Sequence, residues 1–336
     1  MNKENLENFG LKMGKWTMKA PYSRARFWSP ETRATIDLLR PFTLAAPLIV
    51  SMSIMVASLV FNHQKFGLAI PSDWHITVAQ AGLTIAIVNA ASNSLNQAAD
   101  VEADKISKPY RPIPRRLITR DSAQSIAYIF YLFALLRAVT INFWFGLFIF
   151  LIMVFTIAYS LPPRMKKYLL INQIWIAIPR GMLGILASWS VFGQEHLFET
   201  PTPWVIGGVA TAFLIGGMAT KDIIDAKADK VTGVRTMINT FGTKTTAYVS
   251  LPLMIFPFIF IIILINLGLL ARYLWPLSFF SALSFLIFYL MVKEKESKTL
   301  ENVHAWSIMY VTYIFFALVF SVLTIFNDIL PEFLYL

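Results

Sequence analysis

The chain contains no cysteine and few charged residues. Without thiols it has no disulfides, no thiolate ligands for a metal ion and no thiol redox chemistry. Charged residues make up 14% of its 336 positions, against about 25% in a typical soluble domain. Hydrophobic residues make up 57%, and the mean hydropathy is +0.60, which is too apolar for one soluble core. These values indicate an integral membrane protein.

Long apolar runs recur along the sequence. Several reach about 18 to 22 residues, enough to cross about 30 Å of hydrocarbon at about 1.5 Å per helical residue. Charges and turn residues divide these runs into nine predicted spans, near residues 42–62, 76–96, 122–139, 142–161, 169–192, 204–221, 246–266, 274–292 and 304–326. Because the connections are short, we expect one all-α membrane bundle over residues 41–336, built around a central cavity open to lipid.

Residues 1–40 form a polar, basic arm that differs from the rest of the chain. The arm carries eight Lys or Arg residues and lacks the short apolar core of a secretory signal peptide. Its last part, ETRATIDLLRPF, places Ile36, Leu39 and Phe42 at spacings that suit a helix lying on the bilayer surface. We therefore predict a cytoplasmic arm that ends in an interfacial helix.

The distribution of Lys and Arg supports this topology. If the N-terminus is cytoplasmic, 25 of the 29 basic residues lie in the arm or in the loops after spans 2, 4, 6 and 8. Lys65, Arg137 and Arg272 fall on the opposite side, a bias that agrees with the positive-inside rule. The C-terminus is then expected outside. Because the basic residues are spread over five juxtamembrane segments, the +10 charge does not indicate a nucleic-acid partner.

Two acidic clusters follow predicted spans. NQAADVEAD, after span 2, spaces Asn96, Asp100 and Asp104 four residues apart, which places them on one stripe of a helix. KDIIDAKAD, after span 6, has Asp222, Asp225 and Asp229 in an i, i+3, i+7 pattern, again on one face. Like charges at these spacings destabilise a bare helix. We therefore expect something positive against each cluster.

Hard divalent cations fit these clusters best. Mg²⁺ binds carboxylate oxygens, keeps several waters and completes its shell with substrate phosphate oxygens. The four histidines are scattered, so zinc is not expected. Basic residues follow both clusters: Lys105, Lys108, Arg111, Arg115, Arg116, Lys227, Lys230 and Arg235. The acids can bind a metal ion, and the basic residues on the same side of the membrane can bind phosphate oxygens. Together they predict a diphosphate site, and we expect the rest of the cavity wall to be apolar.

A simpler interpretation is that these acids are solvated loop residues that balance Lys and Arg. It accounts well for one DxxxD in isolation. Two clusters at equivalent span ends favour the metal–diphosphate site instead.

At this point the residues resemble a known family. NQAADVEADKISKPYRPIPRRLIT is similar to the NxxxDxxxD signature and trailing KPxRPIP segment of the UbiA superfamily of intramembrane prenyltransferases. KDIIDAKADKVTGVRTMINTFGTK is similar to that family's second acidic motif. LLRPFTL before span 1 and YSLPPRMKK after span 4 also fit, so the resemblance covers nearly the whole chain.

The resemblance implies roles for individual residues. It implies that two sets of side chains hold Mg²⁺ and the donor diphosphate: Asn96, Asp100 and Asp104, and Asp222, Asp225 and Asp229. The catalytic residues would be Asp100, Asp104, Asp225, Asp229 and Tyr159. The diphosphate would be bound by Asn96, Lys108, Arg111, Lys221 and a basic residue among Arg164, Lys166 and Lys167, for which we choose Lys166.

One departure from the family pattern concerns the acceptor. Gln97 occupies a position that is often Asp in the family, which would remove one metal ligand. NQxxD with PYRPIP is reminiscent of the chlorophyll-synthase branch, whereas DIIDAKAD is closer to the quinone and archaeal ether-lipid branches. The acceptor therefore stays open at this stage.

Arg180 is predicted to lie near the middle of span 5, in AIPRGMLG. A charge at that depth costs at least about 2.5–3.5 kcal/mol. Pro179 and Gly181 beside it indicate a kinked helix that opens into a cavity. We interpret Arg180 as a residue that binds an anionic acceptor or the diphosphate; the alternative is a structural Arg paired with a buried carbonyl.

These features predict a Mg²⁺-dependent enzyme that transfers a polyprenyl group from a prenyl diphosphate to a lipophilic acceptor and releases pyrophosphate. Our first choice is a geranylgeranyl donor with a glycerophosphate-lipid acceptor. Aromatic quinone precursors and chlorophyllide-type pigments are the alternative acceptors. An ion-coupled transporter is the alternative from another class, but its acids should lie near the bilayer midplane rather than at span ends.

Overall fold

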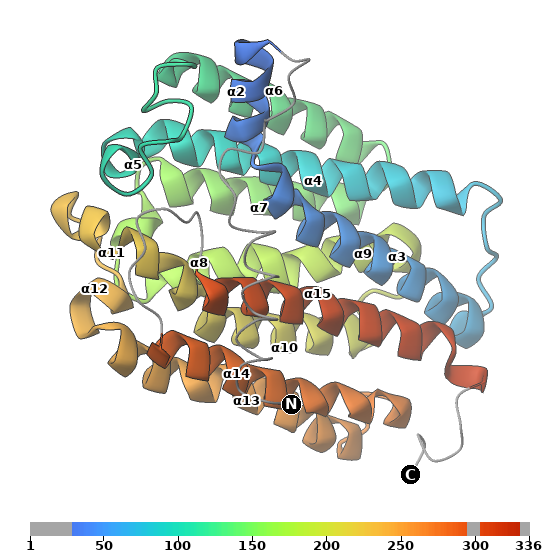
Figure 1. Cartoon of the computed structure of the whole chain (residues 1–336). Helices are drawn as coiled ribbons and strands as arrows, with labels where there is room; N and C mark the ends of the chain where they lie inside the picture. The colour runs from blue at the N-terminus through green and yellow to red at the C-terminus, as the bar shows by residue number, and fades with distance from the viewer. Residues whose placement is uncertain (1–28, 294–302, 330–336) are drawn as a thin grey trace.

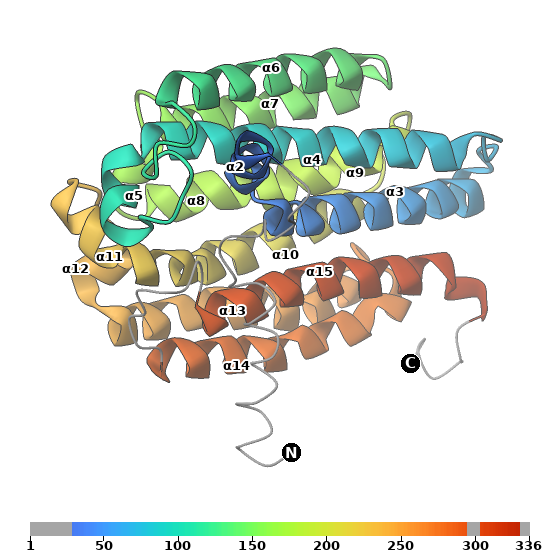
Figure 2. The same ribbon diagram turned by 45° about the horizontal axis from the view of Figure 1, so that its top comes forward.

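The computed structural model describes residues 29–293 and 303–329. Within these ranges it contains nine helical segments that are long and apolar enough to cross a membrane, so the nine-span prediction is confirmed. They are α3 (Ala45–Phe66), α4 (Trp74–Ala99), α6 (Arg120–Val139), α7 (Phe143–Ser160), α8 (Ile171–Ile178) continuing through η3 (Pro179–Leu183) into α9 (Gly184–Gly193), α10 (Thr202–Gly217), α13 (Thr243–Asn266), η5 (Arg272–Phe279) with α14 (Phe280–Lys293), and α15 (His304–Ile325). Figures 1 and 2 show the long helices running side by side along one direction.

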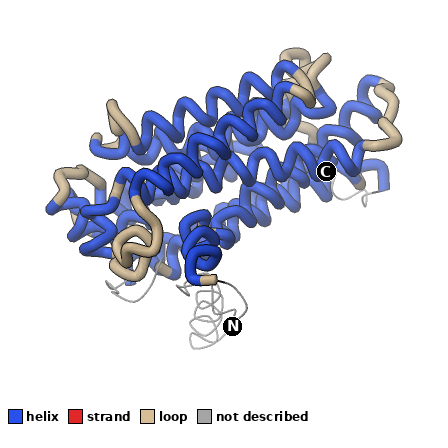
Figure 3. Tube along the Cα trace, turned by 90° about the horizontal axis from the view of Figure 1, so that it is seen from above, coloured by secondary structure: helices blue, strands red, loops and turns tan. Residues whose placement is uncertain are grey.

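Short helices are attached to the ends of the long ones. They are α2 (Pro30–Leu39), η1 (Pro41–Leu44), α5 (Val101–Ser107), η2 (Met165–Lys167), η4 (Met218–Lys221), α11 (Asp222–Val231), α12 (Met237–Phe241) and η6 (Asn327–Ile329). In Figure 1, α5, α11 and α12 gather at the same end of the bundle. Seen from above, loops lie at both ends of the helical bundle, and no strand appears in the described ranges (Figure 3).

The outer helices present apolar side chains to the surroundings. On α6 the exposed residues include Ile129, Leu132 and Leu136, and on α13 they include Phe256 and Phe260. In water such a surface would be a large unsatisfied apolar patch. In a bilayer it contacts lipid, so the burial pattern agrees with a membrane protein.

Helix α2 crosses the bundle instead of running along it, as Figures 1 and 2 show. Ser29 caps it, because its hydroxyl accepts a hydrogen bond from the Thr32 amide, and Leu38 is fully buried against the following elements. The predicted helix in this segment is therefore present, and its place at the bilayer surface stays a prediction. Residues 1–28 of the basic arm and 294–302 of the last basic loop lie outside the described residues.

Helices α10, α13 and α15 pack through interlocking aromatic rings. The ring centroids of Phe213 and Phe258 lie 5.1 Å apart, and those of Phe258 and Phe316 lie 5.4 Å apart. Gly216 brings α10 close to α13, since an added Cβ would lie 2.8 Å from the Ser250 carbonyl oxygen. This packing fixes α10, which leads directly into the second acidic cluster.

We predict that Gly216→Val destabilises the protein by about 1–3 kcal/mol, because the larger side chain would overpack α10 against the α13 backbone. Thermal unfolding in detergent measures the effect. Gly208→Ala is the matched control on the same helix, because its added Cβ would meet only an ordinary contact at 3.9 Å. Equal melting temperatures for Gly216→Val and wild type would contradict this account of the packing.

Candidate active site

A cavity lies inside the bundle and is lined by the long helical segments α3, α4, α7, α8, η3, α9, α10 and α15 and by the short helices η1, α5, η2, η4 and α11. Helices α6, α13 and α14 contribute none of the described lining residues and form the outer wall. One end of the cavity holds both acidic clusters. Farther along the long helices its wall becomes apolar, with residues such as Val50, Ile85 and Ile152.

The first cluster lies where α4 ends and α5 begins. Asp100 stands at this break, and the Asn96 side-chain amide donates to its carboxylate at 2.9 Å. Asp104, one turn farther on, is 4% exposed. The Arg111 guanidinium donates to both Asp104 oxygens at 2.9 Å, so the PYRP segment folds back onto the acids that precede it.

The second cluster lies where α10 passes through η4 into α11. Asp222 forms an ion pair with the neighbouring Lys221, and Asp229 is buried at the cavity wall. Asp225 forms an ion pair with Lys108, which comes from the loop after the first cluster. This pair joins positions 117 residues apart, so the two predicted clusters face each other at one end of one cavity.

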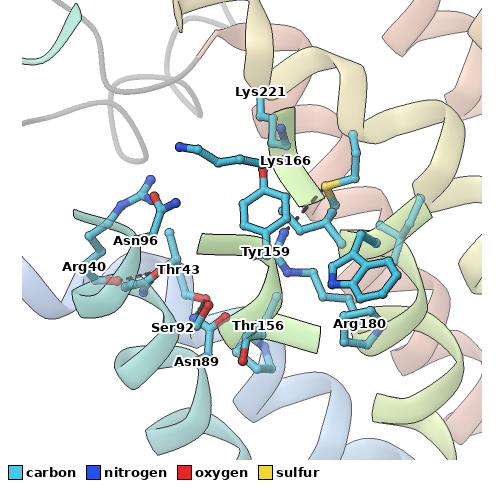
Figure 4. A pocket seen from close by; sticks show the side chains of 18 of the residues that line it. Arg40, Thr43, Asn89, Ser92, Asn96, Thr156, Tyr159, Lys166, Arg180 and Lys221 are labelled. Carbon is cyan, nitrogen blue, oxygen red and sulfur yellow. Dashed lines mark hydrogen bonds between the residues drawn. The ribbon is translucent and has the colours of Figure 1, made fainter. Parts of the chain in front are cut away.

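Tyr159 and Asn172 join Lys221 and Asp222 in a hydrogen-bonded network at this end of the cavity. The Tyr159 hydroxyl donates to the Asn172 side-chain oxygen at 3.0 Å, and the Lys221 ammonium donates to the same oxygen at 3.1 Å. The amide nitrogen of Asn172 in turn donates to Asp222 at 3.2 Å. Tyr159, Lys166 and Lys221 lie together on this side of the pocket in Figure 4.

The short basic segment after span 4 reaches the first cluster. Arg164 donates to Asp100 at 2.8 Å and Lys166 forms an ion pair with the same carboxylate, whereas Lys167 is exposed. Of the three basic candidates in this segment, two therefore contact a cluster acid. Lys166, the residue that we chose from the sequence, lines the cavity. Arg164 is a second basic residue in contact with Asp100.

Burial and neighbouring charge act differently on Asp100 and Asp104, the two aspartates of the first cluster. Burial alone would raise the pKa of Asp100, but the Lys166 and Arg164 cations outweigh it and hold this pKa below its ordinary value. Burial raises the pKa of Asp104 above its ordinary value, against the opposing effect of Arg111 and Lys108. Neighbouring cations therefore favour the ionised form of Asp100, whereas burial disfavours the ionised form of Asp104.

The donor set at this end fits Mg²⁺. Its ligand atoms are the carboxylate oxygens of five aspartates and the amide oxygen of Asn96, and hard oxygen ligands are those that Mg²⁺ prefers. Within the described residues, no three acidic or histidine side chains are close enough to bind one ion by themselves. That arrangement suits a metal that takes one or two carboxylates and obtains its other ligands from water and substrate phosphate.

Comparison with known proteins agrees with this geometry. Residues 51–317 match the model of the UbiA prenyltransferase family, which is well over half of the chain. The chain belongs to the UbiA prenyltransferase family. It is therefore an all-α membrane prenyltransferase, and both the resemblance and the enzyme class inferred from the sequence are confirmed.

The curated relatives of this UbiA-family chain act on different acceptors. It is 26% identical over 256 residues to a digeranylgeranylglyceryl phosphate synthase of Methanobrevibacter smithii, covering 72% of this chain and 87% of that one. It is 24% identical to the enzyme of the same name from Sulfurisphaera tokodaii, covering 55% and 66%. It is also 26% identical over 309 residues to a probable homogentisate phytyltransferase 2 of Oryza sativa subsp. japonica, covering 84% and 76%.

Solved structures share the fold. A UbiA homologue from Archaeoglobus fulgidus bound to GPP and Mg²⁺ aligns with a TM-score of 0.64 at 19% identity, covering 87% of this chain and 98% of that one. A structure concerned with digeranylgeranylglyceryl phosphate synthase in membranes aligns with a TM-score of 0.56 at 20% identity, covering 86% and 99%.

Gln97 has a different place from the one that the family pattern indicated. It is 1% exposed, does not line the cavity, and donates from its side-chain amide to the Leu38 carbonyl at 2.6 Å. Successive helical residues are rotated by about 100°, so the neighbour of Asn96 points away from the cavity. In this UbiA-family chain, position 97 ties α2 to α4, and a metal ligand is not lost there.

Arg180 lies at the cavity, as expected, but the helix around it is not simply kinked. Residues Pro179–Leu183 form a π-helical turn between α8 and α9. The Arg180 guanidinium lies 3.6 Å from the Met218 sulfur, and the Arg180 carbonyl accepts a hydrogen bond from Tyr313. The close view shows it below Tyr159 (Figure 4).

Several lining residues escaped the sequence analysis. Asn172 lies at the start of an otherwise apolar span and belongs to no acidic motif. The others are polar residues of the cavity wall outside the acidic motifs, which Figure 4 labels in part: Arg40, Thr43, Asn89, Ser92, Thr156, Tyr310 and Tyr313. The signal that hints at them is a set of isolated polar residues at cavity-facing positions in apolar runs.

We predict that Gln97→Met lowers stability by about 1–3 kcal/mol, since the Leu38 carbonyl would lose its buried partner, while turnover per folded molecule is retained. Asn96→Ala, one residue away, should lower turnover about tenfold or more with little change in melting temperature, because its side chain faces the acids. Turnover and thermal unfolding of the two purified variants make the comparison. Lower turnover in Gln97→Met with a lower melting temperature in Asn96→Ala would refute the assignment of Asn96 to the cavity face of α4 and of Gln97 to the face toward α2.

Proposed function

We propose that this chain transfers a geranylgeranyl group from its diphosphate to the free hydroxyl of a glycerophosphate ether lipid and releases pyrophosphate. The observation that carries the proposal is a cavity whose wall holds both acidic clusters with their cations and, besides these, two arginines: Arg40, beside Asn96, and Arg180, below Tyr159 (Figure 4). The acids and their cations suit a metal-bound diphosphate, and we assign the two further arginines to the phosphate of an acceptor.

The donor diphosphate binds at the acidic end. We propose that Asn96, Asp100, Asp104, Asp222, Asp225 and Asp229 hold Mg²⁺ there. When bound, Mg²⁺ neutralises charge that develops on the departing pyrophosphate. Structures of a UbiA homologue from Archaeoglobus fulgidus bound to GPP and Mg²⁺, and to DMAPP and Mg²⁺, support this assignment.

The basic residues of the site exchange partners when the substrate enters. Lys108, Arg111, Lys166 and Lys221 now contact cluster carboxylates. With those carboxylates engaged by a metal, the same ammonium and guanidinium groups turn to the phosphate oxygens, where charge-assisted hydrogen bonds are strong. Arg164 joins them from the loop after α7.

Chemistry takes place beside Tyr159, between the acids and the apolar part of the cavity. The bond between C1 of the donor and its diphosphate oxygen breaks, and the electron pair leaves with pyrophosphate. The acceptor hydroxyl oxygen then bonds to C1, and its proton departs with the pyrophosphate. The Tyr159 ring already lies 6.0 Å from the Lys221 ammonium, so we assign its face to the allylic cation as well. The apolar walls exclude water from this cation.

The choice of acceptor class rests on the two cavity arginines, Arg40 and Arg180, and on the relatives. Two guanidinium groups favour a phosphate over a neutral headgroup, and two of the curated relatives described above are digeranylgeranylglyceryl phosphate synthases. Two plant relatives are named as homogentisate prenyltransferases, so an aromatic acceptor is the second candidate. Ion-coupled transport loses its support, because the paired acids lie at the span ends and the chain belongs to a transferase family.

We further propose that the site faces the cytoplasm, with the N-terminus on that side and the C-terminus outside. The support is the excess of Lys and Arg in the segments on the side of the acidic clusters.

We predict Mg²⁺-dependent pyrophosphate release when the purified protein receives geranylgeranyl diphosphate and geranylgeranylglyceryl phosphate. Asp100→Asn and Asp225→Asn should each lower turnover by about 100-fold or more, because each loses a charged metal ligand. Labelled donor, tested against hydroxybenzoate, naphthoate and a chlorophyllide in parallel, identifies the acceptor. Folded variants with full turnover would refute the site, and transfer to another acceptor alone would refute the acceptor class.

We predict that Arg180→Met raises the KM for the phosphorylated acceptor about tenfold or more, because a charge-assisted contact is lost. The KM for the prenyl diphosphate should change much less, since the acids and their cations remain in place. Initial rates with each substrate varied in turn measure both values. A rise confined to the donor would instead assign Arg180 to the diphosphate.

A further inference from the structure

The last helix, α15, places two tyrosines one turn apart against the backbone near the two cavity arginines. The Tyr313 hydroxyl donates to the carbonyl of Arg180 at 2.7 Å. The Tyr310 hydroxyl donates to the Phe42 carbonyl at 3.0 Å and accepts from the Ala46 amide at 2.8 Å. Both tyrosines also line the cavity.

Arg40 lies at a backbone junction that Tyr310 helps to fix. It separates α2 from η1 and has a left-handed conformation with φ of 54°, which is strained for a residue with a side chain. Its guanidinium carbon lies 5.5 Å from the Phe42 ring centroid. The Phe42 ring meets Trp306 edge-on at 6.0 Å, and Trp306 stacks on Tyr310 at 4.8 Å. Tyr310 therefore holds Phe42 through its backbone and, by way of Trp306, through its ring.

Arg180 lies in a π-helical turn whose backbone is held from neighbouring helices. The Met182 amide donates to the Thr211 hydroxyl of α10 at 2.7 Å, and the Tyr313 hydroxyl of α15 donates to the Arg180 carbonyl. Gly181 lets α10 come this close, because an added Cβ would lie 2.7 Å from the Thr211 Cα. A π turn disturbs the regular hydrogen bonding of a helix, so these partners stabilise the conformation that directs Arg180 into the cavity.

We propose that Tyr310 and Tyr313 are positioning residues that set the separation of the Arg40 and Arg180 guanidinium groups, and that α15 thereby determines preference for an acceptor bearing a phosphate. The inference rests on the proposed function, because it takes the two arginines as the acceptor subsite. Since both tyrosines belong to one helix at i and i+3, a shift of α15 moves both supports together.

The test removes the hydroxyl groups and keeps the rings. Tyr310→Phe, Tyr313→Phe and the double variant are compared with wild type, using geranylgeranylglyceryl phosphate and the same ether lipid without its phosphate. Each single change should raise the KM for the phosphorylated acceptor about two- to tenfold, the range expected from one hydrogen bond. The KM for the phosphate-free lipid, and kcat with either, should change little, so the preference for phosphate falls.

Tyr128→Phe is the matched control, because this exposed tyrosine of α6 contacts Gln124 and lies outside the cavity lining. It should leave both KM values unchanged. Unchanged acceptor preference in the double variant overturns the inference, and so does an equal loss with both acceptors together with a lower melting temperature, since that marks a merely structural role.

Arginine variants separate this inference from the proposed function. If Arg40→Met and Arg180→Met raise the KM for the phosphorylated acceptor but the tyrosine variants do not, only the positioning inference fails. If the arginine variants leave that KM unchanged, the acceptor subsite itself is wrong.

Discussion

The structure depends on the neutralisation of buried carboxylates at one end of the bundle. Isolated buried charges are costly, and removing one partner of a buried pair is strongly destabilising. Here each paired acid takes its cation from another part of the chain or from a neighbouring turn: Asp100 from the segment after α7, Asp225 from the segment after α5. The ion pairs therefore fix the relative positions of α4, α5, α7 and α11 as well as the charges of the site.

The same pairs explain how a charged substrate is accommodated in a site of low polarity. A metal ion with a diphosphate brings in a cation and an anion together. In the proposed complex, the carboxylates bind the metal in place of Lys and Arg, and the freed Lys and Arg side chains bind phosphate oxygens. The ion pairs of Asp100, Asp104, Asp222 and Asp225 balance these carboxylates when no substrate is present.

Much of this arrangement follows from sequence, because hydrocarbon thickness fixes the length of a span and helical geometry places residues three or four apart on one face. The acidic clusters were therefore predictable, and Gln97 should have been, since a step of about 100° turns it away from Asn96. Asn172 and Tyr310 were not, because each is an isolated polar residue in an apolar run. The contact of Tyr310 with Phe42 joins residues 268 positions apart and depends on how helices cross.

Irregular backbone in this protein coincides with function for a physical reason. Inside a membrane protein, a helix can leave its regular hydrogen bonding only where protein, ordered water or a cavity satisfies the freed groups. The break at Asp100, the η4 turn before Asp222 and the π turn at Arg180 all line the cavity. Each also carries a charged side chain that a straight helix facing lipid would expose at high cost. The cavity therefore does two things at once: it permits the irregular turns, and those turns supply the charges that make it a site.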